Sequence, residues 1–335
     1  MSQELNVLFD AALWPVLDNV RAILYQVQNS SLSAPCLLRN TDGGDRWSLL
    51  TRWFQNPSPE RCAQVIRLCA ADPELDVRIL AVGEWERATL LADHFRQERV
   101  FLVGDAAHRV TPAGAFGMNT SIQSAHNLAW KLAAVLQGWG GMGLLDSYEA
   151  ERRPWAAKTV ELSYRLNTQG FRAATQTLGH VLGGAYETGA FVPDGTPAPA
   201  NPDPIANYVV TARPGCRAPH AWLKRQSAEI STVDLFDGRF ALLSRSEAWC
   251  EAGRSVAAEL AIPLRAEILD DAGWAATYDV GSDGAVLVRP DGYVAWRSST
   301  TATDSTRELH RILASTLNLP HRAMAMRAED VVTAT

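Results

Sequence analysis

An acidic residue directly after a short apolar run is the first feature of this sequence that could take part in chemistry. Residues 100–103 are all apolar, and Gly104 and Asp105 follow them at once. A run without polar alternation predicts a strand that is covered on both faces, as in a parallel sheet. Because ligands of open α/β sheets gather at the carboxyl ends of the strands, Asp105 could accept hydrogen bonds from the hydroxyl groups of a sugar or polyol.

A glycine-containing loop and the start of a helix come next. The loop over residues 111–117 holds Gly114 and Gly117, which let the backbone approach a flat ligand closely. Met118 and Asn119 then open a helix, whose free backbone N–H groups and dipole favour an electron-rich group. A lone Gly-Asp pair or helix cap could be purely structural, but the order of all these features in one stretch favours a ligand site.

The helix that carries this start is expected to run from about Asn119 to Gln137 and to end at Gly138. Apolar residues at three- and four-residue steps predict one buried stripe. Its members are Ile122, Ala125, Ala129, Leu132, Ala133 and Leu136. A further helix is predicted to start near Leu144 and to run past Arg153, with Pro154 marking a kink or a restart.

The region before this stretch has the pattern of an antiparallel sheet. Strands are predicted at residues 20–27, 36–39 and 47–54, and the last two flank a turn over residues 41–45. That turn contains Asp-Gly and Gly-Gly, which supply the positive φ angles of a hairpin. A helix is predicted from Ser58 to Ala71 with Pro59 in its first turn, and another strand near residues 76–81.

A proline-rich segment separates these elements from a second α/β region. Seven of the 17 prolines lie between Gly189 and Pro219, which predicts an extended linker without a core of its own. Strands are predicted after it at residues 240–243, 264–269, 285–288 and 293–296, with helices at 246–260 and 305–317. The domains are therefore expected at residues 1–98, 99–188, 189–219 (the linker) and 220–335.

Composition excludes several classes of protein. The chain has 335 residues, of which 47% are hydrophobic and 20% charged, so it can build a sizeable core. The net charge of −6 argues against a nucleic-acid partner, and no apolar stretch is long enough to span a membrane. The five cysteines include no C-x-x-C pair, so we expect no metal site and reduced thiols in a cytoplasmic protein.

The whole ordered string resembles the flavin-contacting motif of the FAD-dependent aromatic hydroxylases, the p-hydroxybenzoate hydroxylase-like flavoprotein monooxygenases, and is nearest to the polyketide and phenol hydroxylases. The matching residues are Gly104-Asp105-Ala106-Ala107-His108, Pro112, Gly114, Gly117, Asn119, Asn127-Leu128-Ala129-Trp130-Lys131-Leu132 and residues 145–154. Residues 233–237 and 284–296 look like the thioredoxin-like C-terminal domain of these enzymes. The implied fold is mixed α/β: a partial FAD and substrate domain followed by a thioredoxin-like domain.

The resemblance implies a role for each matching residue. Gly104 and Asp105 should bind FAD, with the Asp105 carboxylate on the ribityl hydroxyls, and Pro112 should lie against the isoalloxazine. Gly117, Met118 and Asn119 should offer backbone N–H groups to the pyrimidine edge of the flavin. In this family NADPH or NADH reduces FAD, O2 adds to give a flavin hydroperoxide, and an aromatic ring is hydroxylated. The implied substrate is an aromatic polyketide of an antibiotic or spore-pigment pathway.

Other residues carry a weaker signal. His108 could act as a base, but we favour a structural role beside Asp105, and the same holds for His126; no catalytic residue is assigned. An aromatic substrate pocket could be lined by Trp47, Trp53, Phe54 and Trp85, with Arg46 or Arg52 meeting an acidic oxygen, although such aromatics are as often plain core. The C-terminal region lacks C-x-x-C, so a role as an interface or lid is favoured over dithiol exchange.

Two departures from the family pattern leave alternatives open. The G-x-G-x-x-G turn that binds the ADP half of FAD is absent, so a companion chain could supply that region. Ser124 stands where relatives usually carry Asp. The chain is therefore read as the C-terminal part of a hydroxylase, or half of a split one, or a non-catalytic remnant that has lost FAD. We expect the purified chain alone to be colourless.

Overall fold

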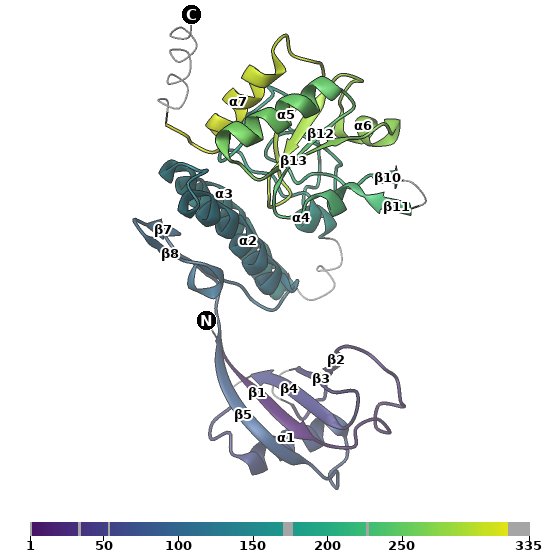
Figure 1. The fold of residues 1–335 in the computed structure, drawn as a ribbon. Coiled ribbons are helices and arrows are strands. Elements are labelled where there is room, and N and C mark those ends of the chain that lie inside the picture. The colour runs from purple at the N-terminus through teal and green to yellow at the C-terminus, as the bar shows by residue number, and fades with distance from the viewer. Residues whose placement is uncertain (1, 33–34, 53, 170–176, 226–227, 321–335) are drawn as a thin grey trace, which may run out of the picture. The chain divides into compact units, whose positions relative to one another are not determined.

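The computed structural model describes residues 2–32, 35–52, 54–169, 177–225 and 228–320 (Figure 1). The chain divides into two compact units, Met1–Thr89 and Leu90–Thr335. Each unit has its own hydrophobic clusters of buried side chains, and each is described by itself below. None of the described helices is both long and apolar enough to cross a lipid bilayer.

The first unit is an antiparallel sheet with one helix packed on it. The strands are β1 (Ser2–Asp10), β2 (Tyr25–Val27), β3 (Cys36–Asn40), β4 (Arg46–Arg52) and β5 (Arg78–Arg87), in the order β2-β3-β4-β1-β5. Helix α1 (Pro59–Ala70) begins at Ser58, whose hydroxyl accepts from the backbone N–H of Arg61. Alternate residues of β1, among them Val7 and Phe9, pack in one cluster with Cys62 and Ile66 of α1.

The predicted hairpin between β3 and β4 is confirmed, as are α1 and the strand that became β5. Asn40 pairs with Trp47, and Gly43 in the turn has a φ of 79°. The strand predicted at residues 20–27 is wrong over its first half, since only Tyr25–Val27 pairs and the Ile23 side chain is 89% exposed. Strand β1 was not predicted, although its alternating buried residues carry the usual signal.

The second unit opens with short ladders instead of the predicted parallel strand. Strand β8 (Val100–Phe101) pairs antiparallel with β7 (Arg96–Gln97), and β6 (Leu90–Leu91) pairs antiparallel with β9 (His108–Arg109). The expectation that residues 100–103 are covered on both faces is wrong, because Val100 is 64% exposed. A strand forms only where a neighbour supplies backbone partners, and among the described residues only β7 flanks β8.

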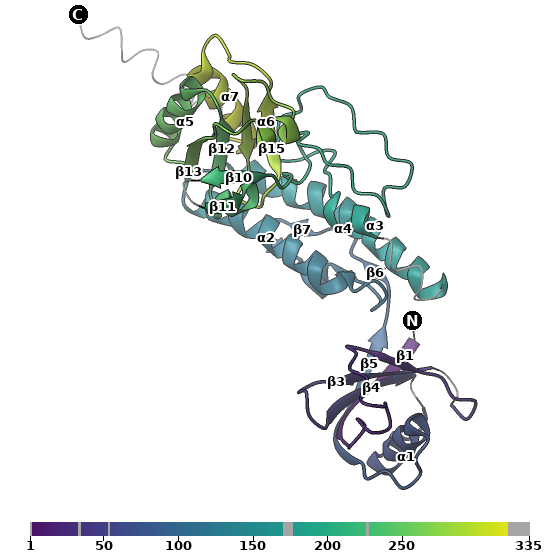
Figure 2. The same ribbon diagram turned by 90° about the vertical axis from the view of Figure 1, so that its right-hand side faces the viewer.

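Two long helices follow, α2 (Phe116–Leu136) and α3 (Asp146–Gln169), joined by the short turn η2 (Met142–Leu145); they lie side by side in Figure 2. The stripe predicted to be buried on α2 is wrong: Ile122 and Leu136 are 59% and 83% exposed. The buried face instead includes Thr120, Ser124, Asn127 and Lys131. Hydropathy missed this face because its polar groups find partners on α3, as shown below.

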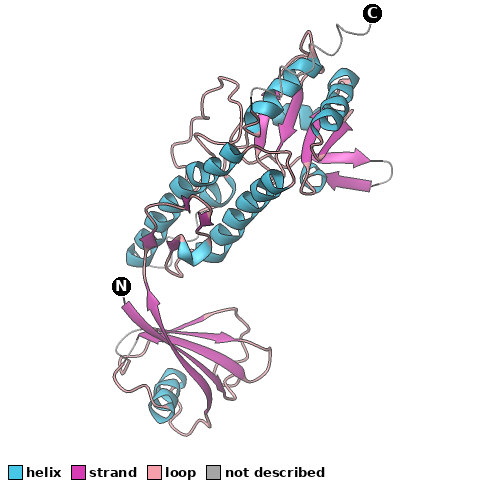
Figure 3. Ribbon diagram, turned by 60° about the vertical axis from the view of Figure 1, so that its left-hand side comes forward, coloured by secondary structure: helices cyan, strands magenta, loops and turns pink. Residues whose placement is uncertain are grey.

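The C-terminal part of the second unit is a four-stranded sheet between helices (Figure 3). Its elements are β12 (Phe240–Ser244), α5 (Glu247–Leu260), β13 (Leu264–Ile268), α6 (Ala272–Tyr278), β14 (Ala285–Val288), β15 (Val294–Ser298) and α7 (Ser305–Thr316). The order is β13-β12-β14-β15, with β13 parallel to β12 and β14 antiparallel to it. The strands and the two helices predicted here are confirmed, whereas α6 was not predicted.

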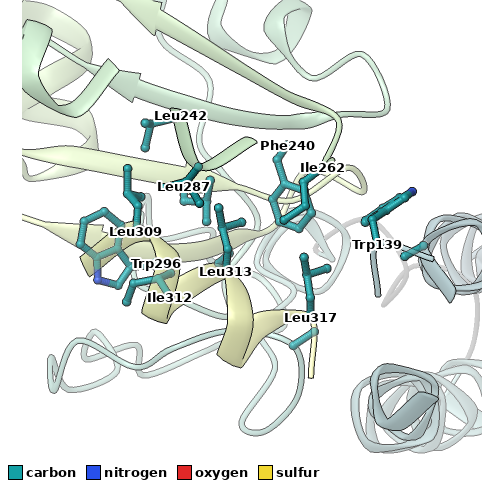
Figure 4. Packing of buried hydrophobic residues seen from close by; sticks show 14 of the residues in the cluster. Trp139, Phe240, Leu242, Ile262, Leu287, Trp296, Leu309, Ile312, Leu313 and Leu317 are labelled. Carbon is teal, nitrogen blue, oxygen red and sulfur yellow. The ribbon is translucent and has the colours of Figure 1, made fainter. Parts of the chain in front are cut away.

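Alternating residues of this sheet pack into two different hydrophobic clusters, one on each face. Phe240 and Leu242 pack with residues of α5 and α7, and Trp139, which follows α2, joins the same cluster (Figure 4). Ala241 and Leu243 face the other side, with residues of α6. The helix α2 and the C-terminal sheet therefore share one continuous hydrophobic core.

The proline-rich segment lies against this sheet. Between helix α4 (Leu178–Leu182) and the hairpin of β10 (Trp222–Arg225) and β11 (Ala228–Ser231), the described chain is extended, as predicted. Its residues Ala190 and Ala212 are buried in the two hydrophobic clusters of the sheet. Backbone hydrogen bonds such as Val192 N–H to Ala295 C=O hold it there.

Candidate functional site

The Gly-Asp pair lies on a tight turn that packs against the start of α2. The turn η1 (Gly104–Ala106) begins after the extended residue Val103, and Gly104 has a φ of 64°. A Cβ at Gly104 would lie 3.4 Å from the hydroxyl oxygen of Ser121, so the absence of a side chain brings the turn close to α2. Asp105 is exposed, and its carboxylate is free to meet a ligand.

The first turn of α2 presents backbone donors next to this carboxylate. Ala115 caps the helix with a φ of 55°, and its own N–H bonds to the carbonyl of Pro112. The N–H groups of the next three residues, Phe116, Gly117 and Met118, have no intrahelical acceptor by the geometry of an α-helix. Asn119 closes the turn, since its side-chain amide donates to the Ala115 carbonyl at 3.1 Å.

The loop between η1 and α2 is pinned to helix α3. The hydroxyls of Thr111 and Ser163 are 2.7 Å apart, and the Ser163 hydroxyl also donates to the Thr111 carbonyl. Gly114 has a φ of 85°, and a Cβ there would lie 2.3 Å from the ring of Phe116. Pro112 is therefore held at the surface on a loop with little freedom.

The six residues predicted to bind a cofactor thus lie on three neighbouring segments. Asp105, Pro112, Met118 and Asn119 are exposed, and the two glycines, Gly104 and Gly117, are partly buried. A carboxylate on η1 and N–H groups without intrahelical acceptors on α2, which η1 contacts, suit a ligand with both hydroxyl groups and an electron-rich ring. In these respects the residues present fit FAD.

Within the described structure, neither histidine of this stretch is placed to act as a catalytic base. His108 is 1% exposed, and within the described structure neither ring nitrogen has a hydrogen-bond partner. Burial and then the charge of Arg152 lower the pKa of His108, while Asp105 opposes them. His126 is exposed on α2.

Beside the middle of α2 lies a fully buried carboxylate that the sequence analysis missed. The Glu151 side chain on α3 accepts from Asn127 Nδ2 at 2.6 Å and from Lys131 Nζ at 2.8 Å, both on α2. It also accepts two bonds from Arg289 of the C-terminal sheet, at 2.7 and 2.9 Å, and one from the Ala190 N–H. The cations lower the pKa of Glu151 to about 2 against the opposing effect of burial.

The next residue of α3, Arg152, is also completely buried. Its guanidinium donates to Ser124 Oγ at 3.2 Å, to the Tyr186 hydroxyl at 3.1 Å, and to the Thr120 carbonyl and Gln123 Oε1 at 3.4 Å each. Glu151 and Arg152 together provide the hydrogen-bond partners of the buried polar face of α2. The signal that could have revealed them is polar and charged residues inside two adjacent helices, ERR on one and N-x-x-x-K on the other.

A separate cavity lies on the sheet of the first unit. It has a volume of about 300 Å³. Its lining residues are Asn6, Leu24, Leu37, Arg39, Ser48, Leu50 and Trp85. The Ser48 hydroxyl donates to Asn6 Oδ1 at 2.7 Å, which joins two neighbouring strands at the floor of the cavity. Apolar walls with a few polar groups are typical of sites for aromatic ligands.

Of the suggested pocket aromatics that the structure describes, only one lines this cavity. Trp85 does so, whereas Trp47 is completely buried in the core beneath α1 and Phe54 packs against that core. Trp53 lies outside the described residues. Neither Arg46, which pairs with Asp10 at 3.0 Å, nor Arg52 lines the cavity, and the arginine found there is Arg39, one strand away. Strand alternation sends Trp47 and Ser48 to opposite faces, which explains the difference.

Comparison with known proteins assigns the fold to a family of flavoproteins. Residues 5–163 match the model of an FAD binding domain, and residues 211–320 match the model described as aromatic-ring hydroxylase, C-terminal. The chain belongs to the family of FAD-dependent aromatic-ring hydroxylases, as the sequence motif predicted.

Curated relatives give the same result. The chain is 38% identical to the tetracenomycin A2 monooxygenase-dioxygenase of Streptomyces glaucescens over 94% of this chain and 62% of the relative. It is 32% identical to the aklavinone 12-hydroxylase of Streptomyces purpurascens over 95% of this chain and 63% of the relative. The chain thus spans less than two thirds of the length of these relatives.

Solved structures are similar as well. The flavin-dependent monooxygenase PieE, in complex with FAD and substrate, superimposes with a TM-score of 0.84 at 31% identity, over 96% of this chain and 66% of that one. Aklavinone-11 hydroxylase, in a ternary complex with FAD and aklavinone, gives 0.82 at 31% identity, over 95% and 63%. These comparisons lend no support to a companion chain, which the sequence left as one possibility. Among the described residues no group of three metal-ligating side chains is present.

Proposed function

We propose that this chain contributes the flavin-facing and substrate-facing parts of an FAD-dependent monooxygenase that hydroxylates an aromatic polyketide. The observation that carries the proposal is the contact of η1 with α2, where Gly104 lies against Ser121 and the Asp105 carboxylate is exposed. This arrangement combines an acceptor for hydroxyl groups and donors for an electron-rich ring on one surface.

Each residue of this surface has a binding role in the proposal. The Asp105 carboxylate accepts hydrogen bonds from the ribityl chain of FAD, and the N–H groups of Gly117 and Met118 donate to the pyrimidine edge. Asn119 closes the helix turn that presents them, and Pro112 lies against the ring. The helix dipole favours the negative charge that the pyrimidine edge gains on reduction.

Bound FAD would supply the redox chemistry that links NADPH or NADH, O2 and the substrate. The residues of this chain hold the flavin and orient the ring that is hydroxylated. No side chain at the flavin surface is assigned as a proton donor or acceptor. His108 is unsuited to that task because its side chain is buried away from solvent.

The cavity of the first unit is the proposed site for the aromatic substrate. Leu37, Leu50 and Trp85 provide flat apolar walls, and Arg39 provides a positive charge for a phenolic or phenolate oxygen. The substrate class follows the relatives, one of which was crystallised with the polyketide aklavinone. A reducing compartment, the cytoplasm, is part of the proposal because none of the five cysteines forms a disulfide.

Labelled oxygen tests this proposal. The chain is incubated with saturating FAD, NADPH or NADH, aklavinone and ¹⁸O₂, and the product is analysed by mass spectrometry. We expect one ¹⁸O atom in each hydroxylated product and nicotinamide oxidation that depends on FAD. The matched control is Asp93→Ala, a change at an exposed carboxylate outside the flavin surface, which should leave both unchanged. A chain that neither binds FAD at any concentration nor forms product contradicts the proposal.

A further inference from the structure

The buried charges beside α2 do not cancel. We define the buried charge cluster as Lys131, Glu151, Arg152, Arg289 and Asp291. The side chains of Lys131, Glu151 and Arg289 are 0% exposed, that of Asp291 is 3% exposed, and the residue Arg152 is 0% exposed. Three cations stand against two carboxylates, so the cluster carries one excess positive charge.

The excess charge belongs to Arg152. Glu151 and Asp291 are both engaged by Arg289, and Glu151 also by Lys131. The partners of Arg152 are neutral oxygen atoms, and among the described residues no carboxylate forms an ion pair with it. Buried cations are normally paired, so an arginine with hydroxyl and carbonyl partners alone is costly to keep in this place. Ser124 Oγ accepts from Arg152 Nε, so a carboxylate introduced at position 124 would face the guanidinium.

This charge lies close to the start of α2. The guanidinium bonds to the Thr120 carbonyl, and Thr120 is four residues, or about 6 Å of helix axis, from the first residue of the helix. His108, which follows the turn with Asp105, senses both charges: Arg152 lowers the pKa of its imidazole and Asp105 raises it. Low-dielectric surroundings screen such a charge only weakly.

We propose that Arg152, left without a carboxylate because residue 124 is serine, gives the N-terminus of α2 a permanent positive potential that favours an anionic ligand edge. The inference rests on the proposed function for one point only, the identity of that ligand as the reduced flavin. Arg152 acts through space and through the Thr120 carbonyl, so it is a positioning residue and touches no ligand. The potential adds to the dipole of α2, which has the same sign at this end.

The substitution Ser124→Asp tests the potential, with Ser124→Asn as the matched control. The two side chains have nearly the same shape, but only aspartate supplies a negative charge to Arg152. The readout is the pKa of His108, followed by NMR in the chain without any ligand. We expect Ser124→Asp to raise this pKa and Ser124→Asn to leave it as in the wild type. Equal pKa values in the two variants would overturn the proposal, even if the aspartate raised the melting temperature.

The second readout is the affinity for FAD in its two redox states. Each variant is titrated anaerobically with oxidised FAD and with dithionite-reduced FAD. We expect Ser124→Asp to weaken binding of the reduced, anionic form by on the order of tenfold, the size of a unit charge at about 10 Å and an effective dielectric of about 20. The oxidised form should change much less. If no form of FAD binds even to the wild type, the proposed function fails, and the His108 titration alone decides this inference.

A second pair of variants protects the test against misfolding of the first. Arg152→Lys keeps the charge and Arg152→Gln removes it, at similar cost to the packing of α2 on α3. We expect His108 to keep its lowered pKa in Arg152→Lys and to lose part of the shift in Arg152→Gln. The same pKa in both would overturn the proposal.

Discussion

Glu151 and Arg289 are 138 residues apart in the sequence and form a two-bond ion pair with no exposed surface. The pair joins helix α3 to the turn after β14. Through Lys131 the same carboxylate also holds α2, the helix that begins at the proposed flavin surface. The C-terminal sheet is thus tied to α2 by charge as well as by the shared hydrophobic core.

Removing one member of this ion pair should lower the stability of the fold. We expect Arg289→Met to lower the free energy of unfolding by about 3–5 kcal/mol, because Glu151 and Asp291 lose their bidentate partner in a place without water. Urea denaturation measures this loss. The control is Arg311→Met, which breaks an exposed pair with Glu308 on α7 and should cost less than about 1 kcal/mol. Similar costs for the two variants would show that the buried pair has no special weight.

The loop that presents Pro112 should tolerate no side chain at Gly114. We expect Gly114→Ala to cost about 2–4 kcal/mol, since the residue has a positive φ and its Cβ would overlap the ring of Phe116. Gly195→Ala is the matched control, because Gly195 has a φ of 80° but open space around it, and it should cost only about 1 kcal/mol. Thermal unfolding of both variants separates the steric overlap from the backbone strain.

Stability should fall in mild acid, partly through His180. Burial, and then the charge of Lys158, lower the pKa of His180 to about 4 from the 6.5 of an unperturbed histidine. Between these values the unfolded chain binds the proton more readily, so the free energy of unfolding falls as pH drops from 6.5 to 4. This histidine should contribute about 2–3 kcal/mol to that fall.

The variant His180→Phe isolates this contribution. His180 stacks on Trp155 at 4.8 Å and meets the edge of Phe116 at 5.0 Å, an aromatic setting that phenylalanine suits. Urea unfolding at pH 7.5 and pH 4.5 should show a smaller loss of stability in the variant than in the wild type. His108 should still contribute in the same direction, because its pKa is also lowered. Equal losses in both proteins would refute the assignment.

Arg39 should decide how the cavity of the first unit treats an acidic oxygen. We expect Arg39→Met to weaken binding of an ionised hydroxylated polyketide by about 1.5–3 kcal/mol, the usual size of a charge-assisted hydrogen bond. Calorimetric titration of the chain at a pH where the ligand is ionised measures the effect. Arg46→Met, whose native side chain pairs with Asp10, should leave the affinity unchanged. Weaker binding in Arg46→Met, with unchanged binding in Arg39→Met, would favour Arg46, which the sequence suggested.

The sequence predicted most of the fold where one pattern dominates. The hairpin of β3 and β4, helix α1 and the strands of the C-terminal sheet carry regular alternation, clear caps or turn residues, and each formed as expected. Prediction from the sequence failed where the structure of a segment depends on which other segment packs or pairs with it. Val100 needed a neighbouring strand to become part of a buried ladder, and no single-chain pattern reports which strand will be there.

The buried face of α2 shows the second kind of failure. A hydropathy rule places Ile122 inside and Lys131 outside, yet the structure has the reverse. Burial of Lys131 is possible only because Glu151 lies opposite, and that pairing depends on how α2 packs against α3. The proposed flavin-binding residues could be named from the sequence for the contrary reason, since Asp105, Pro112 and the start of α2 follow one another within a single short stretch.

The most direct test of the proposed flavin surface is the affinity of the chain for FAD when Asp105 is changed. Fluorescence titration compares the wild type with Asp105→Ala and with the control Asp93→Ala, both at exposed positions where folding should be unaffected. We predict that Asp105→Ala weakens FAD binding by about 1.5–3 kcal/mol, through loss of the acceptor for the ribityl hydroxyls, while Asp93→Ala leaves it unchanged. An Asp105→Ala chain that binds FAD as well as the wild type would contradict the proposed surface.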